Sequence, residues 1–381
     1  MSEIKYKEAI ASVLKCNPEN IFLYWKGRVA LYALLKAMGI KDGDEIVLPA
    51  LTCVVVPNAI KYLNAKPVYI DICPGNYNMN INKLEEAITD KTKVIICQNT
   101  FGLSSNIEQI IDIAKRHNIY TIEDCTHGFG GYYNGRPNGS FCDAAFYSSQ
   151  WNKPFSTGIG GFSVVNNNEL VEKVKNLEGR KVKPNSMNKA FLFFLLIFRK
   201  YFVNNFPQQT LINFYRFLSR HNLVLGSSQG IELTGTEIPE NYFKDISYIQ
   251  VKTGIKQLEK LESINKMRRK NAVDYTLFLE SKKKTYVNEN LFGNHLFLKY
   301  PLLVKDRELF FKLALKEKII LGDWFISPIH PVKENFDKWD LSIDLFPNAK
   351  RISKKIVNLP TDIDDNRKVV DFLNKNLDLI E

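Results

Sequence analysis

The chain has 381 residues, 45% of them apolar, and a formal net charge of +11 at pH 7. This length favours two domains rather than one. The charge favours an acidic partner, but no basic stripe interleaved with aromatics and no zinc-finger or RNA-binding signature occurs, so we expect no nucleic-acid partner. Six scattered cysteines form no C-x-x-C pair, which predicts no metal site and a reducing, cytoplasmic location. The first residues lack the basic start and apolar run of a signal peptide, in keeping with that location.

The first 165 residues alternate short β-branched runs with helical stretches. Apolar residues at helical spacing predict helices over 28–40 and 106–119. Two Asn-Gly pairs within 132–141 predict a hairpin. Strands that alternate with helices predict an α/β fold whose mostly parallel sheet is covered on both faces. The predicted strands are 44–50, 66–72, 93–99, 119–125, 144–149 and 160–165.

From about residue 236 the pattern changes to that of a smaller α+β domain. A single long amphipathic helix is predicted first, followed by two strand-like runs and a closing helix. These elements cover 248–280, 295–304, 355–360 and 367–377. We therefore predict a large domain over 1–185, an apolar, basic insertion over 186–235 and a small C-terminal domain over 236–381.

The insertion has an unusual composition. No acidic residue lies between Glu178 and Glu232, whereas eight Lys or Arg residues do. Its longest apolar run, 190–198, is shorter than the about 20 residues that span a bilayer. Three interpretations stay open: a hairpin at a membrane interface, packing against a partner subunit, or docking of another protein. The side chains that would meet lipid or headgroups are Phe191, Phe193, Phe194, Phe198, Arg199, Lys200 and Arg216.

One lysine lies in a cramped, charge-free stretch, "SSQWNKPFSTGIGG", over 148–161. Asp124 stands at the end of a predicted strand, 29 residues before Lys153, and one further strand lies between them. Because ligands of parallel α/β sheets bind at the carboxyl ends of the strands, the acid and the lysine can meet there. A poorly solvated lysine has a lowered pKa, and a lysine beside a carboxylate suits pyridoxal phosphate. An ordinary lysine on a turn is the alternative interpretation.

A phosphate group would need its own cradle. Gly27 and Arg28 stand at a predicted helix start, where free N–H groups and the helix dipole favour anions. Ser148 lies at the end of a predicted strand and offers a hydroxyl. "GFGGYYNG" lacks the glycine order of a dinucleotide-binding loop.

Several ordered motifs, taken together, carry a resemblance. They are "GRVALYALLKAMGIKDGDEIVLPALTC", "IEDCTHGFGG", "SSQWNKPFSTGIGG", "QLEKLESINKMRRKNA" and "NLPTDI". In these stretches the chain resembles the DegT/DnrJ/EryC1/StrS family of pyridoxal-phosphate sugar aminotransferases. The resemblance implies the aspartate aminotransferase fold, that of fold type I PLP enzymes, and pyridoxal 5'-phosphate as the cofactor.

The resemblance also implies roles for single residues. Lys153 matches the Schiff-base lysine, which also moves a proton between the substrate carbon and the cofactor. Asp124 matches the acid paired with the pyridine nitrogen, and His127 matches a residue near the ring hydroxyl. Ser148 and the backbone of Gly27–Arg28 match the phosphate positions.

Other matched positions lie near the substrate or depart from the family. Asn99 and His330 fall where the family approaches the substrate. Cys53 replaces an aromatic residue that stacks on the cofactor ring, so a stacking partner must come from elsewhere. Ile159 replaces an acid in the glycine motif. The family's Asn-Tyr-Arg stretch is replaced around 241–250, where Asn241 could substitute only with a shifted alignment, so whether a trans-subunit phosphate contact is kept stays open.

The resemblance implies a cytoplasmic homodimeric aminotransferase. It would pass an amino group from glutamate to a nucleotide-linked keto-sugar, for polysaccharide or glycoconjugate biosynthesis. One alternative is an aminotransferase of the same fold that acts on a lipid-linked or non-nucleotide ketone, held at the inner membrane surface by residues 186–232. Another alternative is a non-catalytic, membrane-associated binding protein.

Overall fold

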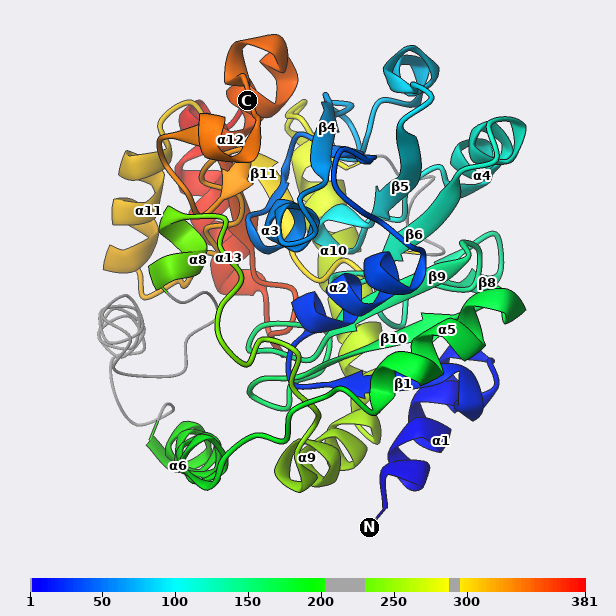
Figure 1. Ribbon diagram of the computed structural model, residues 1–381. Helices are drawn as coiled ribbons and strands as arrows, with labels where there is room; N and C mark the ends of the chain where they lie inside the picture. The colour runs from blue at the N-terminus through cyan, green and yellow to red at the C-terminus, as the bar shows by residue number, and fades with distance from the viewer. Residues whose placement is uncertain (1, 203–229, 288–294) are drawn as a thin grey trace.

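A seven-stranded sheet forms the centre of the N-terminal half in the computed structural model, which describes residues 2–202, 230–287 and 295–381 (Figure 1). Its strand order is β1-β10-β9-β6-β5-β2-β4. Only β10 runs against its neighbours, and the other pairings are parallel. The predicted α/β fold with a mostly parallel sheet is thus confirmed. The strands are β1 (Ile21–Tyr24), β2 (Glu45–Pro49), β4 (Lys66–Ile70), β5 (Thr92–Gln98), β6 (Tyr120–Asp124), β9 (Ala144–Ser148) and β10 (Gly161–Val165).

Helices cover both faces of this sheet, and the strand pattern shows why. Successive residues of a strand point to opposite faces. In β2, Ile46 and Leu48 pack in the core cluster that contains α2 (Gly27–Ala37), whereas Val47 packs in the cluster that contains α4 (Ile107–Arg116). Both faces of the strand are therefore buried, which explains the near-continuous apolar runs in the sequence.

The predicted helices and hairpin of the N-terminal half are present. Helices α2 and α4 fill the two predicted helical stretches, and β7 (Tyr132–Tyr133) pairs antiparallel with β8 (Arg136–Pro137). Strand β1 was not predicted, because its four-residue run is too short to show a period.

The prediction of one long helix over 248–280 is wrong. The segment forms α9 (Tyr248–Leu258) and α10 (Leu261–Ser281), with a break at Glu259–Lys260. The two helices pack on different parts of the chain. Gly254 of α9 lies against Tyr6 of α1 (Glu3–Leu14), whereas α10 bonds to the segment near residue 361. Apolar periodicity continues across the break and so could not reveal it.

The C-terminal part contains a two-stranded antiparallel sheet of β11 (Tyr300–Leu303) and β13 (Ile356–Leu359). The predicted strand over 295–304 is therefore too long. Its first residues bond elsewhere, since Leu296 N–H donates to the carbonyl of Gly102. Helices α11 (Arg307–Lys316), α12 (Pro347–Lys355) and α13 (Arg367–Lys375) flank the small sheet, and α13 confirms the predicted closing helix. One core cluster draws residues from both halves of the chain, so the division into domains stays a prediction.

The first part of the insertion is a helix, α6 (Ser186–Phe202), which lies beside α9 at one edge of the molecule (Figure 1). A short helix, α8 (Gly230–Thr234), ends the insertion, and Arg216 lies outside the described residues. No helix in the described part of the chain combines the length and the apolarity that crossing a bilayer requires.

The contact between α1 and α9 leads to a stability prediction. A Cβ atom at Gly254 would lie 2.4 Å from Tyr6 Cε2, so Gly254→Ala overpacks this contact and should cost about 1–3 kcal/mol. Gly179→Ala is the matched control, because its Cβ meets nothing within 4 Å and its φ of −65° suits alanine. Thermal unfolding should show a lower midpoint for Gly254→Ala only. Equal midpoints for the two variants would contradict the prediction.

Candidate active site

The predicted site residues meet at the carboxyl edge of the sheet. Strand β6 ends at Asp124 and β9 ends at Ser148, five residues before Lys153. The N-terminus of α2, which begins at Gly27, lies against the end of β9. This is the edge at which parallel α/β sheets bind their ligands.

Lys153 lies on a turn, with its ammonium group in a poorly hydrated place. Its main-chain N–H donates to the carbonyl of Gln150 at 3.2 Å, and its Nζ lies 4.8 Å from the ring centroid of Trp324. Desolvation lowers the pKa of Lys153 to about 8. Cys53 and Asp124 act to raise this pKa, and the charge of Arg28 lowers it further. In part of the molecules the Lys153 amine is therefore neutral, and hence nucleophilic, near neutral pH.

Asp124 is buried, with 4% of its surface exposed. Its Oδ1 accepts the N–H of Thr126 at 2.9 Å, which fixes the carboxyl group at the strand end. Burial raises the pKa of this carboxyl, whereas the Thr126 hydrogen bonds and the charge of Lys153 act to lower it. The acid and the lysine thus act on each other's charge in one site.

His127 forms a flat stack with Trp324. The ring centroids are 4.4 Å apart and the planes differ by 7°. The Nδ1 atom accepts the N–H of Phe101 at 3.2 Å, so in the neutral ring Nε2 carries the proton and can donate it. Burial, Lys153 and His330 hold the pKa of His127 well below its usual range, which keeps the ring neutral.

The ring of Trp324 lines this site beside Lys153 and His127. Its main chain is held from both sides by Asn358: the Trp324 N–H donates to Asn358 Oδ1 at 2.8 Å, and Asn358 Nδ2 donates back to the Trp324 carbonyl. An aromatic face therefore lies at a fixed place beside Lys153, although Cys53 offers none.

The residues predicted to hold a phosphate lie close together around Gly27. The residue before it, Lys26, makes no side-chain cap, so the first N–H groups of α2 are not capped from there. A Cβ at Gly27 would lie 2.6 Å from the carbonyl oxygen of Tyr147 and 3.0 Å from Ser148 Cβ. Only glycine fits this close approach, which brings the buried Ser148 beside the helix N-terminus.

The side chain of Arg28 does more than the sequence suggested. Its Nη1 pairs with Glu232 Oε1 of α8 at 2.5 Å, and both side chains are buried. The carbonyl of Glu232 also accepts Asn58 Nδ2 at 2.8 Å. Glu232 was not singled out as a site residue, although it is the first acid after the long acid-free segment, and this was the signal that could have found it.

The two predicted substrate residues lie in different surroundings. Both ends of the Asn99 side-chain amide form hydrogen bonds within the protein. Its Nδ2 donates to Glu123 at 2.9 Å and its Oδ1 accepts the N–H of Ser105 at 3.0 Å. His330 lies in β12 (Ile329–His330), which pairs with β3 (Thr52–Cys53) and sets His330 opposite Cys53. His330 therefore borders the site, and a substrate role for either residue stays a prediction.

Comparisons with known proteins identify relatives of the chain. The DegT/DnrJ/EryC1/StrS aminotransferase family matches residues 25–191 and 230–373. GDP-perosamine synthase of Escherichia coli O157:H7 is 39% identical over 154 residues, which are 40% of this chain and 42% of that protein. The chain thus spans less than half the length of this curated relative.

Solved structures share the fold over nearly the whole chain. A DegT/DnrJ/EryC1/StrS aminotransferase from Brucella abortus has a TM-score of 0.74 at 20% identity, and it covers 97% of this chain and 89% of its own. NtdA from Bacillus subtilis, solved with the bound cofactor PMP, has a TM-score of 0.70 at 19% identity, covering 98% and 77%. At these identities the likeness shows the fold.

A poorly solvated lysine and a buried acid thus lie in one site with the N-terminus of α2, at one edge of a parallel sheet. The chain belongs to the DegT/DnrJ/EryC1/StrS aminotransferase family.

The pKa of Lys153 can be tested without a cofactor. Acylation of Lys153 by limiting acetic anhydride, followed by peptide mass spectrometry, should rise with pH around a midpoint of about 8, because only the neutral amine reacts. Asp124→Asn should lower this midpoint, since the carboxylate raises the pKa of Lys153. The exposed Lys266 gives a reference for reagent decay. A midpoint near 10.5, the ordinary lysine value, or a rise in Asp124→Asn would contradict the assignment.

Proposed function

We propose that the protein is a pyridoxal-phosphate-dependent aminotransferase that passes an amino group from glutamate to a nucleotide-linked keto-sugar in the cytoplasm. The observation that carries this proposal is the placement of Lys153, with its Nζ against the Trp324 ring, in one site with the buried Asp124 at the carboxyl edge of the sheet. An amine that is partly neutral near pH 7 can attack an aldehyde and can also hold and release a proton.

The residues present fit the cofactor. Lys153 Nζ would bind its aldehyde, Asp124 its pyridine nitrogen and His127 Nε2 its ring hydroxyl. Ser148 and the N–H groups at the start of α2 would hold its phosphate. When bound, pyridoxal phosphate supplies an electron-accepting ring that stabilises negative charge on the substrate carbon.

The chain's own groups would perform the remaining steps. Lys153 Nζ would give way to the donor amine and would take up and return the proton at the substrate's α-carbon, a task suited to a pKa near the working pH. Asp124 would hold the pyridine nitrogen in its protonated form. Trp324 limits the access of water to one side of Nζ, which keeps the amine poorly solvated.

Two further observations support the cofactor and the substrate. NtdA shares the fold and was solved with PMP. The name of the relative GDP-perosamine synthase refers to a nucleotide-linked sugar. The net charge of +11 suits a substrate that bears a diphosphate. Glutamate as the donor follows from the resemblance of the sequence motifs.

The first test is a visible absorption band in the presence of pyridoxal phosphate. We expect the purified protein to show the band and borohydride to fix the cofactor covalently on Lys153. Lys153→Ala should show neither, whereas Lys266→Ala, which removes an exposed lysine, should behave as the wild type. If the band forms, glutamate should bleach it and a nucleotide-linked keto-sugar should restore it. No band in the wild type would contradict the proposal and would favour a non-catalytic binding protein.

We also propose that the outer face of α6 contacts an anionic lipid surface. The inner residues Leu192 and Leu196 pack with Trp25 and Ile159, so that face is occupied. The opposite side exposes apolar side chains, and the helix carries basic residues but no acid. The exposed residues are Met187, Phe193, Phe194 and Ile197. Such a contact would favour the alternative in which the enzyme acts on a lipid-linked ketone.

Flotation with vesicles tests this second proposal. The protein should float with phosphatidylglycerol vesicles and much less with phosphatidylcholine vesicles. The double variant Phe193→Ser/Phe194→Ser should lose flotation, whereas Leu309→Ser/Leu315→Ser, which changes two exposed residues of α11, should retain it. If the first double variant changes the sedimentation coefficient and leaves vesicle binding intact, a second copy covers this face instead. The expected homodimer is tested by the same sedimentation measurement.

A further inference from the structure

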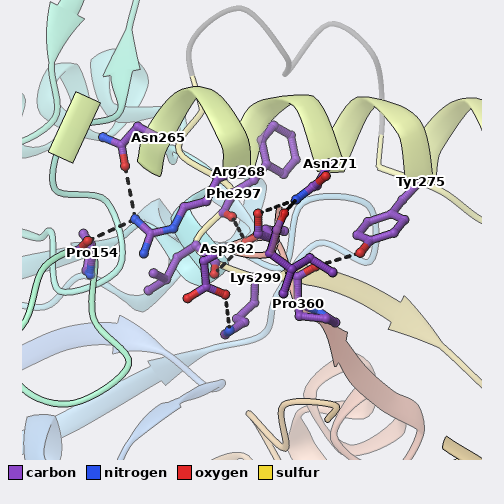
Figure 2. A network of polar contacts seen from close by, with 12 residues as sticks. Pro154, Asn265, Arg268, Asn271, Tyr275, Phe297, Lys299, Pro360 and Asp362 are labelled. Atoms are coloured by element: carbon purple, nitrogen blue, oxygen red, sulfur yellow. Dashed lines mark hydrogen bonds and ion pairs between the residues drawn. The ribbon is translucent and has the colours of Figure 1, made fainter. Parts of the chain in front are cut away.

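One turn of α10 contacts both loops that carry the proposed catalytic groups. Arg268 Nη1 donates to the carbonyl of Pro154 at 3.1 Å, and Pro154 directly follows Lys153 (Figure 2). The same nitrogen donates to Asn265 Oδ1 at 3.1 Å. Asn265 in turn lies against Gly130, where a Cβ would come within 2.6 Å of Asn265 Nδ2. Gly130 lies on the loop that follows Asp124.

The guanidinium of Arg268 is buried, and both hydrogen-bond partners of Nη1 are neutral. Burial lowers the pKa of Arg268 to about 10, so the group still carries its charge at pH 7. Asp362, which pairs with Lys299 at 3.2 Å, acts to raise this pKa. Because a buried charge is costly and this one bonds to a main-chain carbonyl, its place is best explained by the geometry that it imposes.

The rest of α10 is fastened to the C-terminal part of the chain. Asn271 Nδ2 donates to the carbonyls of Thr361 and Ile363 at 2.8 and 2.7 Å, and Tyr275 hydroxyl donates to Pro360 at 2.8 Å. Figure 2 shows Arg268, Asn271 and Tyr275 on the same side of the helix, as their spacing requires. These bonds join later turns of α10 to residues 360–363, separately from the contact of Arg268 with the Lys153 turn.

The turn that carries Lys153 also has a main-chain bond of its own, from the Lys153 N–H to the Gln150 carbonyl at 3.2 Å. Pro154 has no N–H to donate, so the carbonyl is its main-chain hydrogen-bonding group. The next residue, Phe155, is buried with its ring centroid 5.1 Å from that of Phe129. The backbone between Lys153 and Phe155 is thus fixed by the Phe155 ring and by Arg268.

We propose that Arg268 is a positioning residue: by holding the Pro154 carbonyl, it sets the reach of Lys153 toward Asp124. The inference rests on the proposed function, since it concerns the amine that would bind the cofactor. It assigns Arg268 no contact with cofactor or substrate. Hydrogen bonds to charged groups are strong enough for this loss to be measurable.

Four variants test the proposal. Arg268→Met removes the bond, and Arg268→Lys keeps a charge with a shorter reach. Arg269→Met, on the same helix, is the matched control, since no hydrogen bond or ion pair of Arg269 occurs among the described residues. Asn271→Ala breaks the bonds of α10 to residues 361 and 363 without touching the Lys153 turn, and so controls for lost stability.

Two measurements are made on each variant. The dissociation constant for pyridoxal phosphate should rise about tenfold or more in Arg268→Met, less in Arg268→Lys, and not in the controls. The acylation midpoint of Lys153 in the apoprotein should move from about 8 toward 10.5 in Arg268→Met, because a looser turn exposes Nζ to water. The groups that act on Lys153, namely Asp124, Cys53 and Arg28, are unchanged in every variant.

The outcomes separate the two proposals. Unchanged cofactor affinity and midpoint in Arg268→Met, or equal changes in Asn271→Ala, would overturn the positioning role. If Arg268→Met does not fold, Arg268→Lys decides by the same two values. If the wild type binds no pyridoxal phosphate, the proposed function fails, and the acylation midpoint still tests whether Arg268 sets the environment of Lys153.

Discussion

The partial desolvation of one ammonium group, that of the half-buried Lys153, is the constraint on which the candidate site depends. In water a lysine is almost wholly protonated at pH 7 and cannot attack a carbonyl. Here the chain sets Nζ against the ring of Trp324 and between charges of both signs, and the pKa falls to about 8. Those groups come from distant parts of the sequence. The sheet, α2 and the C-terminal loop must therefore all be in place before the amine has its reactivity.

The charge of Arg28, which acts on Lys153, is balanced by an ion pair with Glu232. Arg28 lowers the pKa of Lys153, yet its own charge is countered by Glu232 at 2.5 Å. The ion pair thus limits how far the charge of Arg28 can lower the pKa of Lys153. It also fixes α8, the end of the insertion, to the start of α2. A segment that looked unrelated to the chemistry in the sequence is in this way bonded to the helix that would hold phosphate.

Parallel-sheet geometry explains what the sequence could predict. Asp124 and Lys153 were expected to meet because both follow strands whose carboxyl ends share an edge, and the structure brings them to one site. Cys53 showed that an aromatic face was missing but not which residue would supply one. Trp324 and Arg268 act through contacts over long sequence separations, and no local pattern marks such contacts. Glu232 did carry a signal, as the first acid after the acid-free segment, but nothing in the sequence names Arg28 as its partner. The break between α9 and α10 was missed because apolar periodicity continues across it.

Two helices, α10 and α6, contact the turn that carries Lys153 and the glycine loop after it. On one side, Arg268 of α10 binds the Pro154 carbonyl. On the other, the glycine loop after the turn fits closely against α6, since a Cβ at Gly158 would lie 2.9 Å from Leu192 Cδ1. Leu192 lies on the inner face of the helix whose outer face is exposed and apolar. Close packing transmits displacement, so a surface that moved α6 would also move the glycine loop. The first helix of the unusual insertion is therefore in direct contact with the glycine loop that follows the Lys153 turn.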